Sequence, residues 1–136
     1  MPYAERTDID NVFGSINVDQ WADLNNNQDA QEIADRVEWA LETAHAKLNN
    51  RLRGGRYAIP FEAPVDPQIV NLEAQLAGLA LYDSRGVGDD EDTQDTFSKL
   101  RKSLWQEVSK IRAGQIRLDV TDVATSVPQV IAENDS

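Results

Sequence analysis

A double glycine followed by two prolines limits what the middle of this chain can fold into. Gly54 and Gly55 end a stretch with helical periodicity, and glycine adopts without strain the left-handed conformation that closes a helix. Pro60 and Pro64 follow shortly, and proline prevents immediate re-entry into a helix. The segment is therefore predicted to be an extended arm. Its large apolar side chains are Tyr57, Ile59 and Phe61. These must pack on their own domain or on a neighbour.

The stretch before the double glycine predicts a long amphipathic helix over residues 29–53. Apolar residues recur there at spacings of three or four: Ile33, Val37, Leu41, Ala44, Leu48 and Leu52. This spacing places them on one face of a helix. Acidic residues occupy the first half of the segment and basic residues the second, an order that complements the helix dipole.

Two further long helices are predicted after the arm. Asp66 and Pro67 form a start signal for a helix reaching residue 82 that is apolar nearly all round, as expected in the middle of a bundle. A last helix is expected from residue 92 or 93 to residue 113. A short helix capped by Thr7 is expected near the N-terminus, with another short turn over residues 18–24. The predicted fold is all-α: a helical bundle of about three main helices plus a short N-terminal helix.

The periodicity changes after Gly114. Ile116, Leu118 and Val120 alternate with polar residues, which is strand spacing, yet no other segment predicts a strand to pair with them. Residues 1–114 are therefore expected to form the helical domain, and residues 115–136 an extended C-terminal arm with a mobile tail. Residues 115–123 are predicted to pair with another chain. The alternative is that Ile116 and Leu118 fold back on the bundle.

Length and composition predict one soluble, cytoplasmic domain. A chain of 136 residues can bury one core, and it has no cysteine for disulfides or thiolate metal sites. No signal peptide is visible, and the longest mainly apolar stretch, residues 76–82, is too short to span a membrane.

The chain is acidic, and its charged residues are unevenly distributed along the sequence. The net charge of −11 argues against a surface that binds nucleic acid. Residues 57–92 carry eight acidic residues against one basic residue, whereas residues 93–118 carry six basic against two acidic. This asymmetry suits packing of identical subunits, acidic face on basic face. The alternative is a solvated acidic surface with one basic helix.

The sequence offers no catalytic, cofactor or metal site. His45 is the only histidine, so a triad or histidine metal site lacks partners, and we interpret it as a partly packed structural residue. The acidic run at residues 89–92 fails the EF-hand pattern, because Arg85 and Gln94 stand where that pattern needs acidic ligands. We expect neither a catalytic activity nor a bound cofactor.

Three arginines near the double glycine, Arg51, Arg53 and Arg56, are candidate contact residues. Arginine pairs readily with carboxylates, here on an adjacent subunit. A surface salt network within the chain and phosphate binding are the alternatives. In addition to these three arginines, the predicted partner or oligomer contacts are Tyr57, Ile59, Phe61, Ile116, Leu118 and Val120.

Several motifs, taken in order, carry a family resemblance. The chain opens with Met1-Pro2-Tyr3-Ala4, Asp8-Ile9 and Phe13-Gly14. Gly55-Arg56-Tyr57 precedes Pro60, a helix ends in Leu81-Tyr82, and residues 111–118 read Ile-Arg-Ala-Gly-Gln-Ile-Arg-Leu. Over roughly residues 3–118 the chain resembles the small helical virion proteins of Mu-like phages. These are similar in turn to head–tail connector (adaptor or head-completion) proteins of tailed phages.

The resemblance implies a structural role. Such a protein forms a homo-oligomeric ring, commonly a dodecamer, below the portal protein, and it extends the DNA channel toward the next neck or tail-terminator component. It is assembled in the host cytoplasm and located in the virion neck; DNA only passes through it, and it contacts no membrane. The alternative is a helical DNA-binding or packaging accessory protein, supported by the basic segment over residues 99–117.

Overall fold

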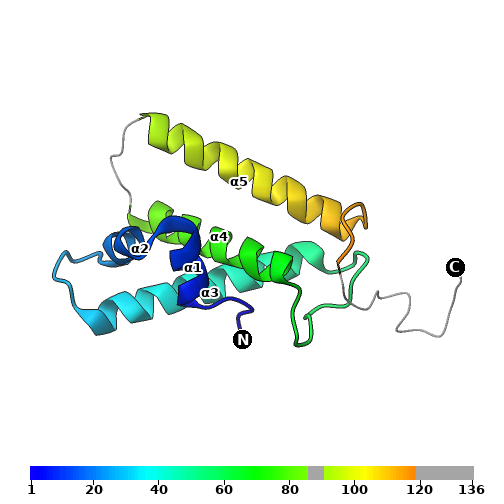
Figure 1. Ribbon diagram of the computed structural model, residues 1–136, viewed down its shortest axis with the longest axis horizontal. Coiled ribbons are helices and arrows are strands. Elements are labelled where there is room, and N and C mark those ends of the chain that lie inside the picture. Colours follow the sequence, from blue (N-terminus) through cyan, green and yellow to red (C-terminus); the bar gives the residue numbers. More distant parts are fainter. Residues whose placement is uncertain (86–90, 119–136) are drawn as a thin grey trace, which may run out of the picture.

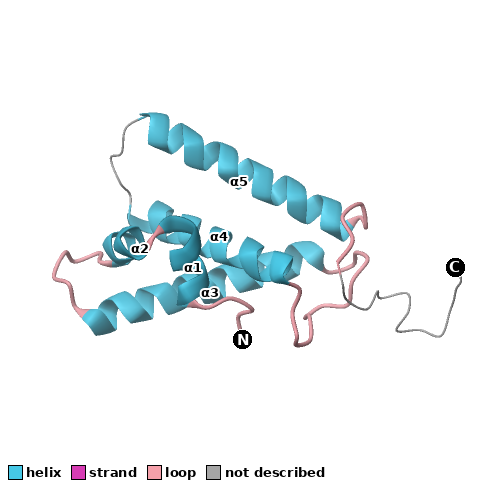
Figure 2. Cartoon of the chain, in the orientation of Figure 1, coloured by secondary structure: helices cyan, strands magenta, loops and turns pink. Residues whose placement is uncertain are grey.

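The computed structural model describes residues 1–85 and 91–118, and its ordered elements are helices (Figure 1). In chain order these are α1 (Arg6–Phe13), α2 (Ser15–Ala22), α3 (Ala30–Leu52), α4 (Pro67–Arg85) and α5 (Glu91–Arg112). Figure 2 shows no strand in this described part of the chain. The all-α prediction is confirmed, and α3, α4 and α5 are its three main helices.

The central helix of the bundle is α4, which contacts each of the other four. It runs antiparallel to α3, and α5 then returns in the same direction as α3 (Figure 1). The side chains of α4 are buried nearly all round, and the apolar ones buried most deeply are Ile69, Leu72, Ala74, Ala77 and Leu81. This burial explains why the α4 sequence lacks the polar face that a surface helix needs.

Local signals explain where the long helices begin and end. The Asp29 carboxylate accepts hydrogen bonds from the backbone N–H groups of Gln31 (2.9 Å) and Glu32 (3.0 Å), which caps α3. Gly54 has φ +80° directly after α3, as the double glycine predicted. The Asp66 side chain accepts from Gln68 N–H at 2.8 Å, so α4 starts at Pro67 as predicted.

Two predictions near the N-terminus were wrong in detail. Thr7 does not cap α1; it lies inside the helix, which begins at Arg6 because Asp8 accepts a hydrogen bond from Glu5 N–H (2.8 Å). The short turn expected over residues 18–24 is instead the two-turn helix α2. Gly14, with φ +89°, separates α1 from α2, and the Asn17 side chain donates to the exposed carbonyl of Phe13 (2.8 Å).

Candidate interaction surface

The predicted contact residues that the structure describes, all but Val120, gather at one end of the molecule, where α3 and α5 both finish. Arg56 N–H donates to the Arg112 carbonyl at 2.9 Å, which joins the chain after α3 to the last turn of α5. Gly55 makes this approach possible, because an added Cβ would lie 2.7 Å from the Arg112 carbonyl oxygen. Three chain segments therefore meet here: the end of α3 with its arm, the end of α5, and the residues after it (Figure 1).

The apolar residues of the arm pack on their own subunit. Tyr57 is only 2% exposed, and its hydroxyl oxygen accepts a hydrogen bond from Leu118 N–H at 2.8 Å. Phe61 is also buried, and Ile59 lies half-buried against the same core. The need of this segment for an apolar environment is thus met within the chain.

The C-terminal segment follows the fold-back alternative as far as the structure describes it. Leu118 is buried, and Ile116 packs against the core from a half-buried position. Both side chains thus have apolar neighbours in their own subunit, and the predicted pairing of residues 115–123 with another chain stays a prediction. Val120 and the rest of residues 119–136 lie outside the described residues. The domain boundary at residue 114 stays a prediction.

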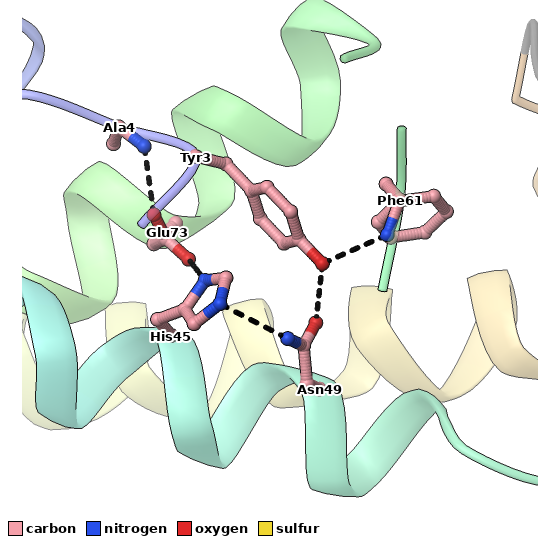
Figure 3. A network of polar contacts seen from close by, with 6 residues as sticks. All are labelled: Tyr3, Ala4, His45, Asn49, Phe61 and Glu73. Carbon is pink, nitrogen blue, oxygen red and sulfur yellow. Dashed lines mark hydrogen bonds and ion pairs between the residues drawn. The ribbon is translucent and has the colours of Figure 1, made fainter. Parts of the chain in front are cut away.

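A polar network links the N-terminal segment, α3, α4 and the arm (Figure 3). The Tyr3 hydroxyl donates to Asn49 Oδ1 at 2.8 Å and accepts from Phe61 N–H at 2.9 Å. His45 Nδ1 lies 2.8 Å from Glu73 Oε1, and Glu73 Oε2 accepts from Ala4 N–H at 2.7 Å. The network thereby attaches the N-terminal segment and the arm, which have no secondary structure, to α3 and α4.

Hydrogen-bond directions in this network favour one tautomer of His45. The Asn49 amide nitrogen lies 3.2 Å from His45 Nε2, and an amide nitrogen can only donate. Nε2 therefore accepts, and a neutral ring carries its proton on Nδ1, where it donates to the Glu73 carboxylate. His45 is a packed structural histidine, as the sequence predicted.

Glu73 is a fully buried carboxyl group on the central helix. Burial raises the pKa of Glu73, and the hydrogen bonds from Ala4 N–H and His45 only partly oppose this shift. Burial also raises the pKa of Tyr3, which keeps its hydroxyl a donor to Asn49. Sequence reasoning missed this network. Its signal was Glu73 itself, the only charged residue between Asp66 and Asp83 in an otherwise apolar helix.

The predicted arginines differ in their surroundings. Arg51 is exposed and lies over the Trp105 ring, 4.7 Å from its centroid. Arg53 is exposed and donates to Asn50 Oδ1 at 2.5 Å. Arg56 is half-buried, with its side chain against Gly114. Within the described residues, neither Arg51 nor Arg53 forms an ion pair with a carboxylate, so their predicted role across a subunit boundary stays a prediction.

Residues 1–85 and 91–118 contain neither a metal-binding cluster nor a membrane-spanning helix. No group of three or more metal-ligating side chains occurs among them. Nor does any helix in these ranges have both the length and the apolar character required to cross a membrane.

These features define a class of protein: a small all-α bundle with an internal polar network and unpaired charged residues on its surface. The family model described as Bacteriophage Mu, Gp36 matches residues 3–133. The chain therefore belongs to the bacteriophage Mu Gp36 family, and it is a Mu-like phage protein, as the sequence motifs indicated. The family points to a structural or morphogenesis role. The searches of curated proteins and of solved structures gave no match.

Proposed function

We propose that this protein is a head–tail connector (adaptor or head-completion) protein of a Mu-like phage. In this role it forms a ring below the portal, extends the DNA channel and joins the head to the tail. The observation that carries the proposal is membership of the Mu Gp36 family over residues 3–133. The proposed partners are further copies of the chain, which form a dodecameric ring, together with the portal protein and the next neck or tail-terminator component.

The polar groups of the protein support a structural rather than a catalytic role. The interior groups that could do acid–base chemistry, the buried Glu73 and the partly buried His45, bond to each other and to Ala4 and Asn49. Glu73 is fully buried, so no substrate reaches it without opening the bundle. These groups hold two chain segments in place, which is a folding task, and we propose that the protein is not an enzyme.

The net charge suits a protein that surrounds DNA in transit. At −11 the chain repels the phosphate backbone, which keeps the duplex from adhering to the wall of a channel. The proposed location is the virion neck, after assembly in the host cytoplasm and without membrane contact.

The test is to mix the full chain with purified portal of the same phage and to image the product by electron microscopy. We expect a ring of this protein coaxial with the portal, and no added density when an unrelated acidic helical protein replaces it. Failure to bind the portal at micromolar concentration would overturn the proposal. Retention of duplex DNA at physiological ionic strength, lost at higher salt, would instead favour a DNA-binding accessory role.

A further inference from the structure

Charge is separated along the long axis of the molecule. Helices α3 and α5 run in the same direction, and each begins with acidic residues and finishes with basic ones (Figure 1). We call the end where they finish the basic end, and its exposed cations are Lys47, Arg51, Arg53, Lys110 and Arg112. The opposite, acidic end carries Asp19, Glu32, Asp35, Glu91 and Asp92. Roughly 35 Å of α3 separates the two ends.

Among residues 1–85 and 91–118, no carboxylate neutralises the cations of the basic end. Each observed ion pair of the described residues uses another cation, such as Arg6 with Asp19 or Arg101 with Asp83. In that part of the chain none of the five basic-end residues has a carboxylate within ion-pair distance. A surface with clustered, unpaired cations attracts an acidic partner and repels another copy of itself.

The acidic end contains an open hollow of about 360 Å³ between α3 and the segment after α2, lined by both apolar and charged residues. Ala22, Leu24 and Trp39 contribute its apolar lining, and Glu32 and Asp35 contribute two carboxylates. Arg36 also lines it, with its guanidinium over the Trp39 ring at 3.8 Å from the centroid. Leu24 is 42% exposed and Trp39 39% exposed. The two carboxylates outnumber the Arg36 guanidinium, so the hollow is acidic and fits a cationic side chain whose aliphatic stem packs on Leu24 and on the exposed part of Trp39.

The acidic hollow and the basic end are therefore complementary in charge and are carried by the same chain. The carboxylates of the hollow repel partners that carry phosphate. A second copy of the chain instead presents the lysine and arginine side chains of its basic end. We propose that the basic end of one copy docks in the acidic hollow of the next. Because the two surfaces differ, the contact is head-to-tail, and such contacts form a ring when the rotation closes. This inference rests on the proposed function, since it names the contact between subunits of the ring.

The test is sedimentation velocity of the full chain without portal, over a concentration series at low ionic strength. We expect the mean mass to rise with concentration beyond that of a dimer and to fall when salt is added, because both surfaces are solvent-exposed. A chain that stays monomeric throughout, an assembly that stops at two copies, or association that strengthens with salt would overturn the proposal.

Charge reversal then tests the pairing itself. One variant carries Glu32→Lys with Asp35→Lys, and another carries Arg53→Glu with Lys110→Glu. Each alone should associate at least about tenfold more weakly. Mixing the two should restore association. The intact basic end of the first variant can then dock in the intact acidic hollow of the second. If mixing does not restore it while circular dichroism shows both variants folded, the pairing is wrong.

Two single substitutions of exposed apolar residues test the role of the hollow. Trp39→Ser should weaken association, whereas Ile16→Ser should not, since Ile16 is more exposed (73%) but lies outside the hollow. Equal effects would overturn the role of the hollow. The outcomes are separable from the ring on the portal. Self-association without portal binding refutes the proposed function alone, and a closed ring formed on the portal by each charge-reversed variant by itself refutes this inference alone.

Discussion

At the scale of single residues, Tyr57 joins the arm to the C-terminal segment through both its ring and its hydroxyl. The ring is buried, and the hydroxyl satisfies the backbone N–H of Leu118. Tyr57→Phe keeps the ring and leaves that buried donor unpaired, so we expect a loss of about 1–3 kcal/mol in the free energy of unfolding. Tyr57→Ala also leaves a cavity and should cost about 3–5 kcal/mol. Urea unfolding measures both. No loss in Tyr57→Phe would show that the hydroxyl contributes nothing, and equal losses in the two variants would show that the ring contributes nothing.

Glu73 gives a second prediction at this scale, concerning pH. Because burial raises its pKa above the usual 4.5, the folded chain holds this proton more tightly than the unfolded chain. Its contribution to stability is therefore complete below pH 4.5 and is lost as the pH rises through the raised pKa. The groups facing it are His45 from α3 and the N-terminal Tyr3 and Ala4.

Glu73→Gln removes this titration. We expect the wild-type chain to lose stability relative to the variant as the pH rises above 4.5, and the difference then to level off. Urea unfolding of both chains across this range measures the difference. A difference that is independent of pH, or one that changes in the opposite direction, would contradict the assignment.

At the scale of elements, Gly78 sets how closely α1 approaches the central helix. An added Cβ there would overlap the Phe13 ring, which is held by edge-on contacts with Trp21 (5.4 Å) and Phe97 (6.0 Å). Overpacking costs about 1–3 kcal/mol, against roughly 1 kcal/mol gained from the better helix propensity of alanine. Gly78→Ala should therefore destabilise the wild-type chain.

The same substitution should change sign when the ring is absent. In a Phe13→Ala background the space is open, and Gly78→Ala should then stabilise the chain by up to about 1 kcal/mol through helix propensity. A double-mutant cycle by thermal or urea unfolding compares the two backgrounds. An equal effect in both would show that α1 does not depend on the glycine.

At the scale of the whole molecule, the separation of charge predicts how stability responds to salt. The net charge is −11, and like charges are neighbours at each end, so repulsion within the folded chain is screened by added ions. We expect the Tm to rise between about 0.01 M and about 0.15 M NaCl. The variant with Glu32→Lys and Asp35→Lys has fewer neighbouring negative charges at the acidic end, so its Tm should rise less when salt is added. Differential scanning calorimetry at low protein concentration checks both, and a Tm that falls with salt would contradict the argument.

The sequence by itself determined the helical elements of this protein. Apolar spacing in α3 and α5, the all-apolar character of α4, the Asp66-Pro67 start and the Gly54 stop are local properties, so short stretches of sequence carry them. Gly14 at the end of α1 is a local signal of the same kind. The Thr7 cap was wrongly predicted, because a nearby side chain, Asp8, competes for the role.

Only the tertiary structure decided where the two arms go and which polar groups meet. Alternating apolar residues at 116 and 118 are compatible with pairing to another chain or with folding back, and the choice depends on Tyr57, which is far away in sequence. The network of Tyr3, His45, Asn49 and Glu73 likewise joins residues from three distant segments. The separation of charge into two ends also needed the fold, since it arises from α3 and α5 lying in the same direction. Local patterns encode local hydrogen bonding and periodicity, whereas these contacts exist only once the bundle has brought distant segments together.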